Sequence, residues 1–201
     1  MSASSIKKDL FNLPNALTYL RVLLIPVVMW LIHVGTPQSC GVAAVLFTVA
    51  AITDFFDGYL ARKLGLVSLT GKFLDPLADK LIVMASIIML AAQGWIQDWL
   101  VVLVLTREMS VTELRALAAT EGMLVPSDTW GKFKTAFQLV GLVGLIIHYE
   151  YECDWGVFSQ RISYHLVGVW LFGLSVAFSL YSGLNYFIQF LKRIDDAKSK
   201  A

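Results

Sequence analysis

Six long apolar stretches divide this chain of 201 residues. Each holds about 20 residues, the length that an α-helix needs to cross a hydrocarbon core of about 30 Å. With 57% hydrophobic and 15% charged residues, the chain has few polar side chains with which to cover a water-facing surface. The sequence therefore predicts six transmembrane helices, over residues 15–34, 41–62, 73–93, 97–118, 132–149 and 164–191.

The segments between these stretches are short and rich in turn residues. None is long enough for a second domain, so we expect a single all-α membrane domain over residues 1–201. Residues 1–13 combine Lys7 and Lys8 with spaced apolar side chains, a pattern typical of a short amphipathic helix on the membrane surface. Residues 192–201 are expected to form a cytoplasmic tail.

The basic residues lie on one side of the membrane in this topology. With the N-terminus inside, all of the 16 Lys and Arg residues except Arg161 fall at inner ends or in inner loops. The outer loops carry Asp98, Glu150, Glu152 and Asp154. Because Lys and Arg collect on the cytoplasmic side, we expect both termini to be cytoplasmic. The start of the chain lacks a transit peptide, which is compatible with a bacterial inner membrane.

Four aspartates lie near the inner ends of the second and third stretches. Asp54 and Asp57 are three residues apart, and Asp75 and Asp79 are four apart, so each pair projects from one helix face. The short connection makes the two helices antiparallel neighbours, and the four carboxylates can then converge on one point. Carboxylates at membrane depth are costly, which makes these residues candidates for a functional site.

Four converging carboxylates need cations, because like charges a few ångströms apart repel strongly at low dielectric. Oxygen ligands without His or Cys favour a hard ion such as Mg²⁺, with Mn²⁺ and Ca²⁺ as alternatives. Two ions sharing Asp54 and Asp75 would suit attack on a phosphoryl group. Three other interpretations remain open: an interfacial ion-pair network with nearby Arg and Lys, an ion or proton path, and solvated helix ends.

The aspartates belong to a longer motif. It reads Asp54-Phe55-Phe56-Asp57-Gly58-Tyr59-Leu60-Ala61-Arg62, followed by Gly71, Asp75 and Asp79 after gaps of eight, three and three residues. This pattern resembles the complete signature of the CDP-alcohol phosphotransferase family. The resemblance implies six transmembrane helices, a homodimer, and a cytoplasm-facing polar cavity that contains two metal ions, Mg²⁺ or Mn²⁺.

The same resemblance implies a role for each acidic residue. Asp54, Asp57 and Asp75 would hold the first ion, while Asp54, Asp75 and Asp79 would hold the second. Asp79 would also be the catalytic base, since a carboxylate within hydrogen-bond reach of a hydroxyl can take its proton.

Six further residues are expected from the resemblance to contact the CDP-lipid: Asn15, Thr18, Gly58, Arg62, Ser68 and Gly71. The arginine offers a charged fork suited to a pyrophosphate, and the glycines lack a Cβ, so backbone and nucleotide can approach closely. Plainer explanations exist for four of these positions. Arg62 alone is typical of a charge that orients a span, the glycines of helix packing, and Asn15 of a helix N-cap.

A second polar group lies in the fourth and fifth stretches. Arg107, Glu108, Thr112 and Arg115 fall within an arc of about 140° on one helix. Lys132 and Lys134 occupy the first turns of the next helix, where positive charge opposes the helix dipole. A bound phosphate would explain these lysines, and the arginines would complete its site. The alternative is that the lysines only set membrane orientation.

The residues Thr106-Arg107-Glu108, Leu114-Arg115 and Gly131-Lys132-Phe133-Lys134-Thr135 resemble the phosphatidylglycerophosphate synthases within the family. This resemblance implies CDP-diacylglycerol as the donor and sn-glycerol 3-phosphate as the acceptor, whose phosphate suits the basic group formed by Arg107, Arg115, Lys132 and Lys134. We expect membrane lipids, and no nucleic acid, among the partners. Inositol phosphate, serine or phosphatidylglycerol as acceptor remain alternatives, as does a cation transporter that uses the aspartates as its ion site.

Overall fold

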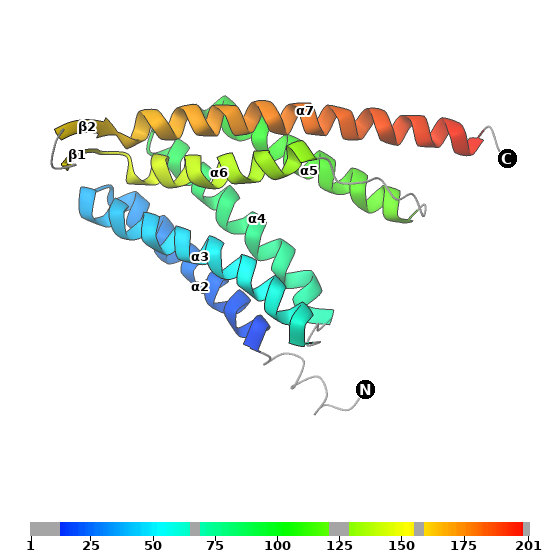
Figure 1. Ribbon diagram of the computed structural model, residues 1–201, viewed down its shortest axis with the longest axis horizontal. Coiled ribbons are helices and arrows are strands. Elements are labelled where there is room, and N and C mark those ends of the chain that lie inside the picture. The colour runs from blue at the N-terminus through cyan, green and yellow to red at the C-terminus, as the bar shows by residue number, and fades with distance from the viewer. Residues whose placement is uncertain (1–12, 65–68, 121–128, 155–158, 199–201) are drawn as a thin grey trace.

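In the computed structural model of this protein, the described residues form six long helices and one short hairpin (Figure 1). The structure describes residues 13–64, 69–120, 129–154 and 159–198, and it describes side chains for residues 15–53, 74–120, 130–151 and 161–194. The helices are α2 (Leu13–Val34), α3 (Pro37–Leu64), α4 (Leu69–Ala92), α5 (Asp98–Thr120), α6 (Thr129–Ile147) and α7 (Tyr164–Lys198). The predicted interfacial helix over residues 1–13 lies almost entirely outside the described residues.

Each predicted apolar stretch corresponds to one of these helices, so the all-α prediction is confirmed for the described residues. Three segments are long and apolar enough to cross a membrane, namely Asn15–Val34, Trp130–Ile147 and Tyr164–Ile194. In α3 the apolar part is the shorter segment Pro37–Thr53. Six helices are thus shown, while six membrane spans remain a prediction.

Local chemistry explains where the chain turns. Gly35 adopts a positive φ of 67°, which a residue without a Cβ tolerates, and Thr36 caps the next helix because its Oγ1 accepts a hydrogen bond from Ser39 N at 3.2 Å. Pro37 then occupies the first helical position, where its missing N–H costs nothing. Gly94 has a φ of 71° in the turn between α4 and α5.

The polar segment between α6 and α7, expected only as a short connection with turn residues, contains two strands. Strands β1 (Glu150–Asp154) and β2 (Ser159–Ser163) form an antiparallel hairpin, with Tyr151 paired with Ile162. Tyr149 donates a hydrogen bond from its hydroxyl to the carbonyl of Gly35, so the start of the hairpin is tied to the turn between α2 and α3. The hairpin lies at the end of α7 that is opposite the C-terminus (Figure 1).

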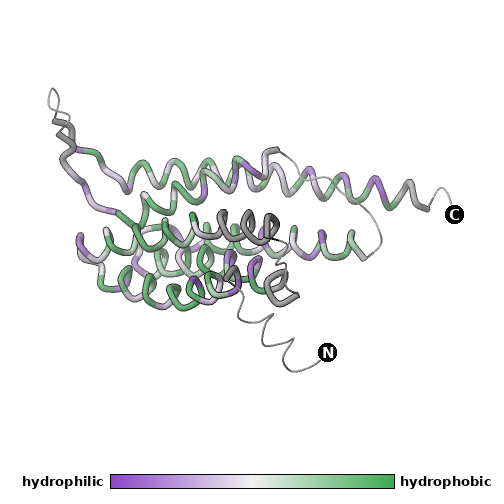
Figure 2. The backbone as a smooth tube through the Cα atoms, turned by 60° about the horizontal axis from the view of Figure 1, so that its bottom comes forward, coloured by the Kyte–Doolittle hydropathy of each residue, from purple (hydrophilic) through white to green (hydrophobic). Residues whose placement is uncertain are grey.

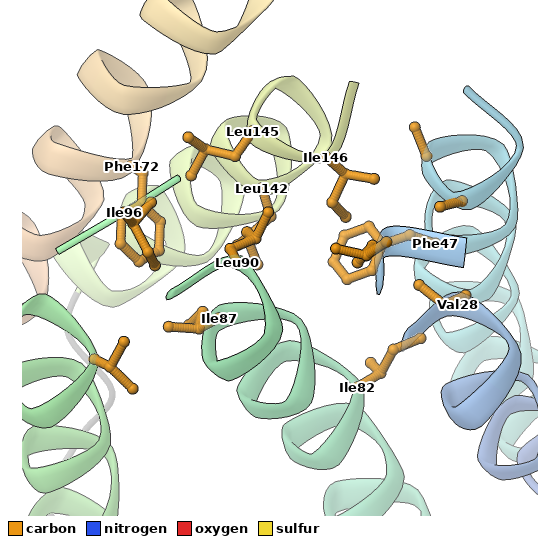
Figure 3. Close-up of a cluster of buried hydrophobic side chains, with 14 of the residues drawn as sticks. Val28, Phe47, Ile82, Ile87, Leu90, Ile96, Leu142, Leu145, Ile146 and Phe172 are labelled. Atoms are coloured by element: carbon orange, nitrogen blue, oxygen red, sulfur yellow. The ribbon is translucent and has the colours of Figure 1, made fainter. Parts of the chain in front are cut away.

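The helices pack in two groups. Helices α6 and α7 run along each other, while α2 packs against α3 and α4 (Figure 1). At the crossing of α6 and α7, a Cβ added to Gly168 would lie 2.5 Å from the backbone nitrogen of Leu145, so only glycine permits this approach. The two groups meet in a buried apolar core, where Leu90 of α4 and Phe47 of α3 lie near Leu142 and Ile146 of α6 (Figure 3).

Many large apolar side chains are exposed. Leu23, Val102 and Trp170 are each more than 60% exposed, and they lie on three different helices. Figure 2, which colours the backbone by hydropathy, shows hydrophobic residues recurring along the helices. This surface, together with the apolar helices, is that of a membrane protein.

Candidate functional site

Two side chains of α2 hold two carboxylates of α4. Thr18 Oγ1 donates a hydrogen bond to Asp75 Oδ1 at 2.6 Å, and Arg21 Nη1 donates one to Asp79 Oδ1, also at 2.6 Å. The two donors are one helical turn apart, as are the two acceptors, so the pairs lie one above the other between the helices. Helix α2 thereby contacts both aspartates of the motif whose side chains are described, Asp75 and Asp79.

The Arg21–Asp79 pair is unevenly exposed. The side chain of Arg21 is 1% exposed, whereas that of Asp79 is 39% exposed. A guanidinium taken out of water is costly unless an anion accompanies it, so Asp79 compensates the buried charge. The carboxylate remains partly accessible at the same time.

The other acidic residues of the motif lie on α3. The backbone at Asp54 and Asp57 is helical, near the C-terminal end of α3, but their side chains are outside the described set. Among the described side chains, no three His, Cys, Asp or Glu residues gather into a metal site. Convergence of all four aspartates therefore stays a prediction.

The predicted CDP-lipid residues are described only in part. Asn15 is buried at 2% exposure, and Thr18 at 1%. The hydroxyl of Thr18 is directed to Asp75, so its described contact is with a carboxylate of the motif. Gly58 and Arg62 lie on α3 and Gly71 lies in the first turn of α4, with side-chain surroundings outside the described set, and Ser68 lies outside the described residues.

The basic group of α5 and α6 is organised around one carboxylate. Glu108 Oε2 accepts a hydrogen bond from Arg107 Nη1 at 3.1 Å, and the same oxygen accepts one from Lys134 Nζ. The Nε of Arg107 also donates to the carbonyl of Ser179 on α7 at 2.8 Å. Three helices therefore contribute to the position of these two cations.

The two predicted lysines lie in different surroundings. Lys134 is buried at 8% exposure, whereas Lys132 is exposed. Positions two residues apart on a helix differ by about 200°, so both cannot face the same neighbour. The exposed Arg115 lies with its guanidinium carbon 5.5 Å from the ring centre of Tyr186, within cation–π range.

A cavity of about 190 Å³ joins the acidic and the basic groups. Its wall includes Asp79 and Arg21 from one group and Glu108 and Lys134 from the other. Lys80 and Gln138 also line it, and Lys80 Nζ donates a hydrogen bond to Thr112 Oγ1 at 2.7 Å. The remaining wall is largely apolar.

Sequence reasoning missed two features of this region. It counted Arg21 among the basic residues at inner ends and did not predict its ion pair with Asp79. It gave α7 no role, yet Ser179 and Tyr186 of that helix contact Arg107 and Arg115. A backbone carbonyl such as that of Ser179 leaves no signal in the sequence. Arg21 did leave one, because its spacing of three from Thr18 puts both side chains on one helix face.

Comparison with known proteins matches this chain to one family over most of its length. The model of the CDP-alcohol phosphatidyltransferase family matches residues 11–181. A Bacillus subtilis protein named CDP-diacylglycerol–glycerol-3-phosphate 3-phosphatidyltransferase is 37% identical over 190 residues, covering 89% of this chain and 94% of the relative.

Two further relatives extend the comparison. A Rickettsia bellii protein with the same name is 38% identical over 177 residues, covering 88% of this chain and 93% of the relative. A Mycobacterium tuberculosis protein named probable phosphatidylglycerophosphate synthase is 33% identical over 195 residues, covering 94% and 87%. The family match over residues 11–181 includes the segments that carry both polar groups of the cavity.

Proposed function

We propose that this chain, which belongs to the CDP-alcohol phosphatidyltransferase family, transfers the phosphatidyl group of CDP-diacylglycerol to sn-glycerol 3-phosphate. The products would be phosphatidylglycerophosphate and CMP. One observation carries this proposal: Asp79 and Lys134 line the same cavity. A proton acceptor and a phosphate-binding cation are then available to a single small acceptor molecule.

The choice of acceptor rests on the buried cations. Lys134 is almost fully buried, and a cation in that position is costly unless it has an anionic partner. Glu108 supplies one negative charge to Arg107 and Lys134 together, so the group keeps an excess of positive charge. A phosphorylated alcohol fits this excess better than a neutral alcohol such as serine does. The relatives named above support the same acceptor.

The acidic residues fit a divalent metal. Asp75 and Asp79 are hard oxygen donors one turn apart, already held in place by α2. Asp54, Asp57, Asp75 and Asp79 would hold the metal, which we propose to be two ions of Mg²⁺ or Mn²⁺. When bound, the metal supplies positive charge next to the pyrophosphate of the donor.

The protein's own groups would carry out the proton and phosphate chemistry. Lys134, Arg107 and Arg115 bind the phosphate of the acceptor and thereby orient its 1-hydroxyl. Asp79 takes the proton of that hydroxyl while the oxygen bonds to the lipid-linked phosphorus. The bond from this phosphorus to the bridging oxygen breaks, and CMP leaves. Arg62, Asn15, Ser68, Gly58 and Gly71 are proposed to hold the CDP moiety, and Thr18 to hold Asp75.

The setting of the reaction follows from the apolar surface. The acyl chains of the donor would stay in the bilayer while the polar reactants meet at the cavity. We propose six membrane spans in one domain, cytoplasmic termini, a cytoplasm-facing site in a bacterial inner membrane, and a homodimer. The excess of Lys and Arg in the inner segments supports this orientation.

An acceptor assay tests the proposal. Purified protein would receive CDP-diacylglycerol, a divalent metal and one acceptor at a time: glycerol 3-phosphate, inositol phosphate, serine or phosphatidylglycerol. We expect metal-dependent CMP release with glycerol 3-phosphate. Release with another acceptor alone would overturn the acceptor assignment, and the absence of CMP release together with cation flux in vesicles would favour a transporter.

A further inference from the structure

We infer that Glu108 is the positioning residue of the acceptor-phosphate site, through its simultaneous contacts with Lys134 and Arg107. This inference rests on the proposed function, because it assumes that these cations bind the phosphate of the acceptor. Glu108 is negatively charged, as a phosphate is. It would therefore not be expected in a site whose residues only bind phosphate.

Glu108 connects two helices, α5 and α6. Helices α5 and α6 both pack on α7, and among the described residues their backbones approach each other little. The carboxylate of Glu108 bridges this separation, because one oxygen accepts hydrogen bonds from Arg107 of its own helix and from Lys134 of α6. Removing that bridge would leave the flexible side chain of Lys134 to find its own position in the cavity.

Glu108 offsets part of the positive charge around Lys134. Arg107 and Arg115 both repel the ammonium group of Lys134, and Glu108 is the group that attracts it. Three cations and one carboxylate leave a formal charge of +2 in this group. A phosphate monoester carries a charge between about −1.5 and −2 near pH 7, so the group and the ligand are closely matched.

Arg107 and Lys134 differ in their contacts other than Glu108. The Nε of Arg107 donates a hydrogen bond to the Ser179 carbonyl at 2.8 Å, and it lies over Gly183, where an added Cβ would be only 3.3 Å away. Lys134 has no comparable restraint in the contacts described beyond Glu108. The carboxylate therefore matters most for the lysine, and its role is to fix the ammonium group before the acceptor arrives.

The test is the variant Glu108→Gln, assayed for CMP release at varied glycerol 3-phosphate. We expect the KM for glycerol 3-phosphate to rise about 10-fold, with the KM for CDP-diacylglycerol unchanged, because only acceptor binding uses the bridge. Glu108→Asp, which keeps the charge, should recover part of this loss. Glu113→Gln is the matched control, since Glu113 is an exposed carboxylate on the same helix.

A double variant separates positioning from general destabilisation. If Glu108 acts through Lys134, Glu108→Gln should change the KM for glycerol 3-phosphate by less than about 2-fold when Lys134 is already Ala. An unchanged or lowered KM in the single variant would overturn the inference, as would full additivity in the double variant. Failure of the wild-type protein to use glycerol 3-phosphate would instead overturn the proposed function.

Discussion

Arg21 and Asp79 form an ion pair with 2.6 Å between Nη1 and Oδ1, and the arginine of this pair is withdrawn from solvent while the carboxylate is not. Both residues line the cavity, where we propose that the acceptor hydroxyl approaches Asp79. This relationship links α2 to the proposed base.

Replacing Arg21 should disable the base without removing it. In Arg21→Ala, Asp79 loses the partner that positions it, and we expect the rate of CMP release at saturating substrates to fall by about 100-fold or more, since a displacement of about 1 Å at a catalytic group can cost that much. Arg21→Lys keeps the positive charge but lacks the forked guanidinium, so its rate should lie between those of the wild type and of Arg21→Ala. Arg193→Ala, at an exposed position on α7, is the control. Wild-type activity in Arg21→Ala would contradict the positioning role.

The hydroxyl of Thr18 should affect the metal requirement. Thr18→Val keeps the shape but removes the hydrogen bond to Asp75, so we expect the Mn²⁺ or Mg²⁺ concentration for half-maximal CMP release to rise about 10-fold or more. Thr18→Ser should restore it. A chelator should abolish activity in the wild type, with recovery on addition of the metal. An unchanged metal dependence in Thr18→Val would contradict a role for Thr18 in holding Asp75 for the metal.

The two lysines of α6 should differ in their effect on the acceptor. Lys134 lines the cavity and Lys132 is exposed, so we expect Lys134→Ala to raise the KM for glycerol 3-phosphate about 10-fold or more, and Lys132→Ala less than about 3-fold. Steady-state kinetics with each single variant measures this. Equal effects of the two substitutions would mean that both lysines reach the phosphate.

The close crossing of α6 and α7 should depend on Gly168. A Cβ there would lie 2.5 Å from the backbone nitrogen of Leu145, so Gly168→Ala should destabilise the protein by about 1–3 kcal/mol. Thermal unfolding in detergent measures the effect as a lowered midpoint. Gly173→Ala is the matched control, because nothing lies within 4 Å of a Cβ at that position. Equal midpoints for the two variants would show that the helices separate easily.

The positions of the helices could be predicted because apolar length and turn residues are local properties. The predicted stretch 15–34 and the observed α2, Leu13–Val34, nearly coincide. The last helix is longer than predicted, since α7 continues to Lys198 and the expected limit was residue 191. Polar residues such as Lys192 and Arg193 have high helix propensity and continue the helix beyond its apolar part. The β1–β2 hairpin escaped prediction because its strands are short and polar.

The candidate site was predictable in its residue types and less so in its contacts. Helical spacing put Asp75 and Asp79 on one face and identified Arg107, Glu108 and Arg115 as a polar side. It did not reveal that Thr18 and Arg21 are the partners of the two aspartates, because spacing along one helix contains no information on which neighbour faces it. The same 100° per residue, applied to Lys132 and Lys134, would have separated them.

The sequence by itself determined that this protein is a set of apolar helices with an acidic motif and a basic group, because helix length, periodicity and residue chemistry are properties of the chain. Tertiary structure alone decided that Arg21 faces Asp79, that Glu108 joins Lys134 to Arg107, and that both groups open into one cavity. These pairings depend on how helices cross, and the crossings are set by close approaches such as that of Gly168 to Leu145.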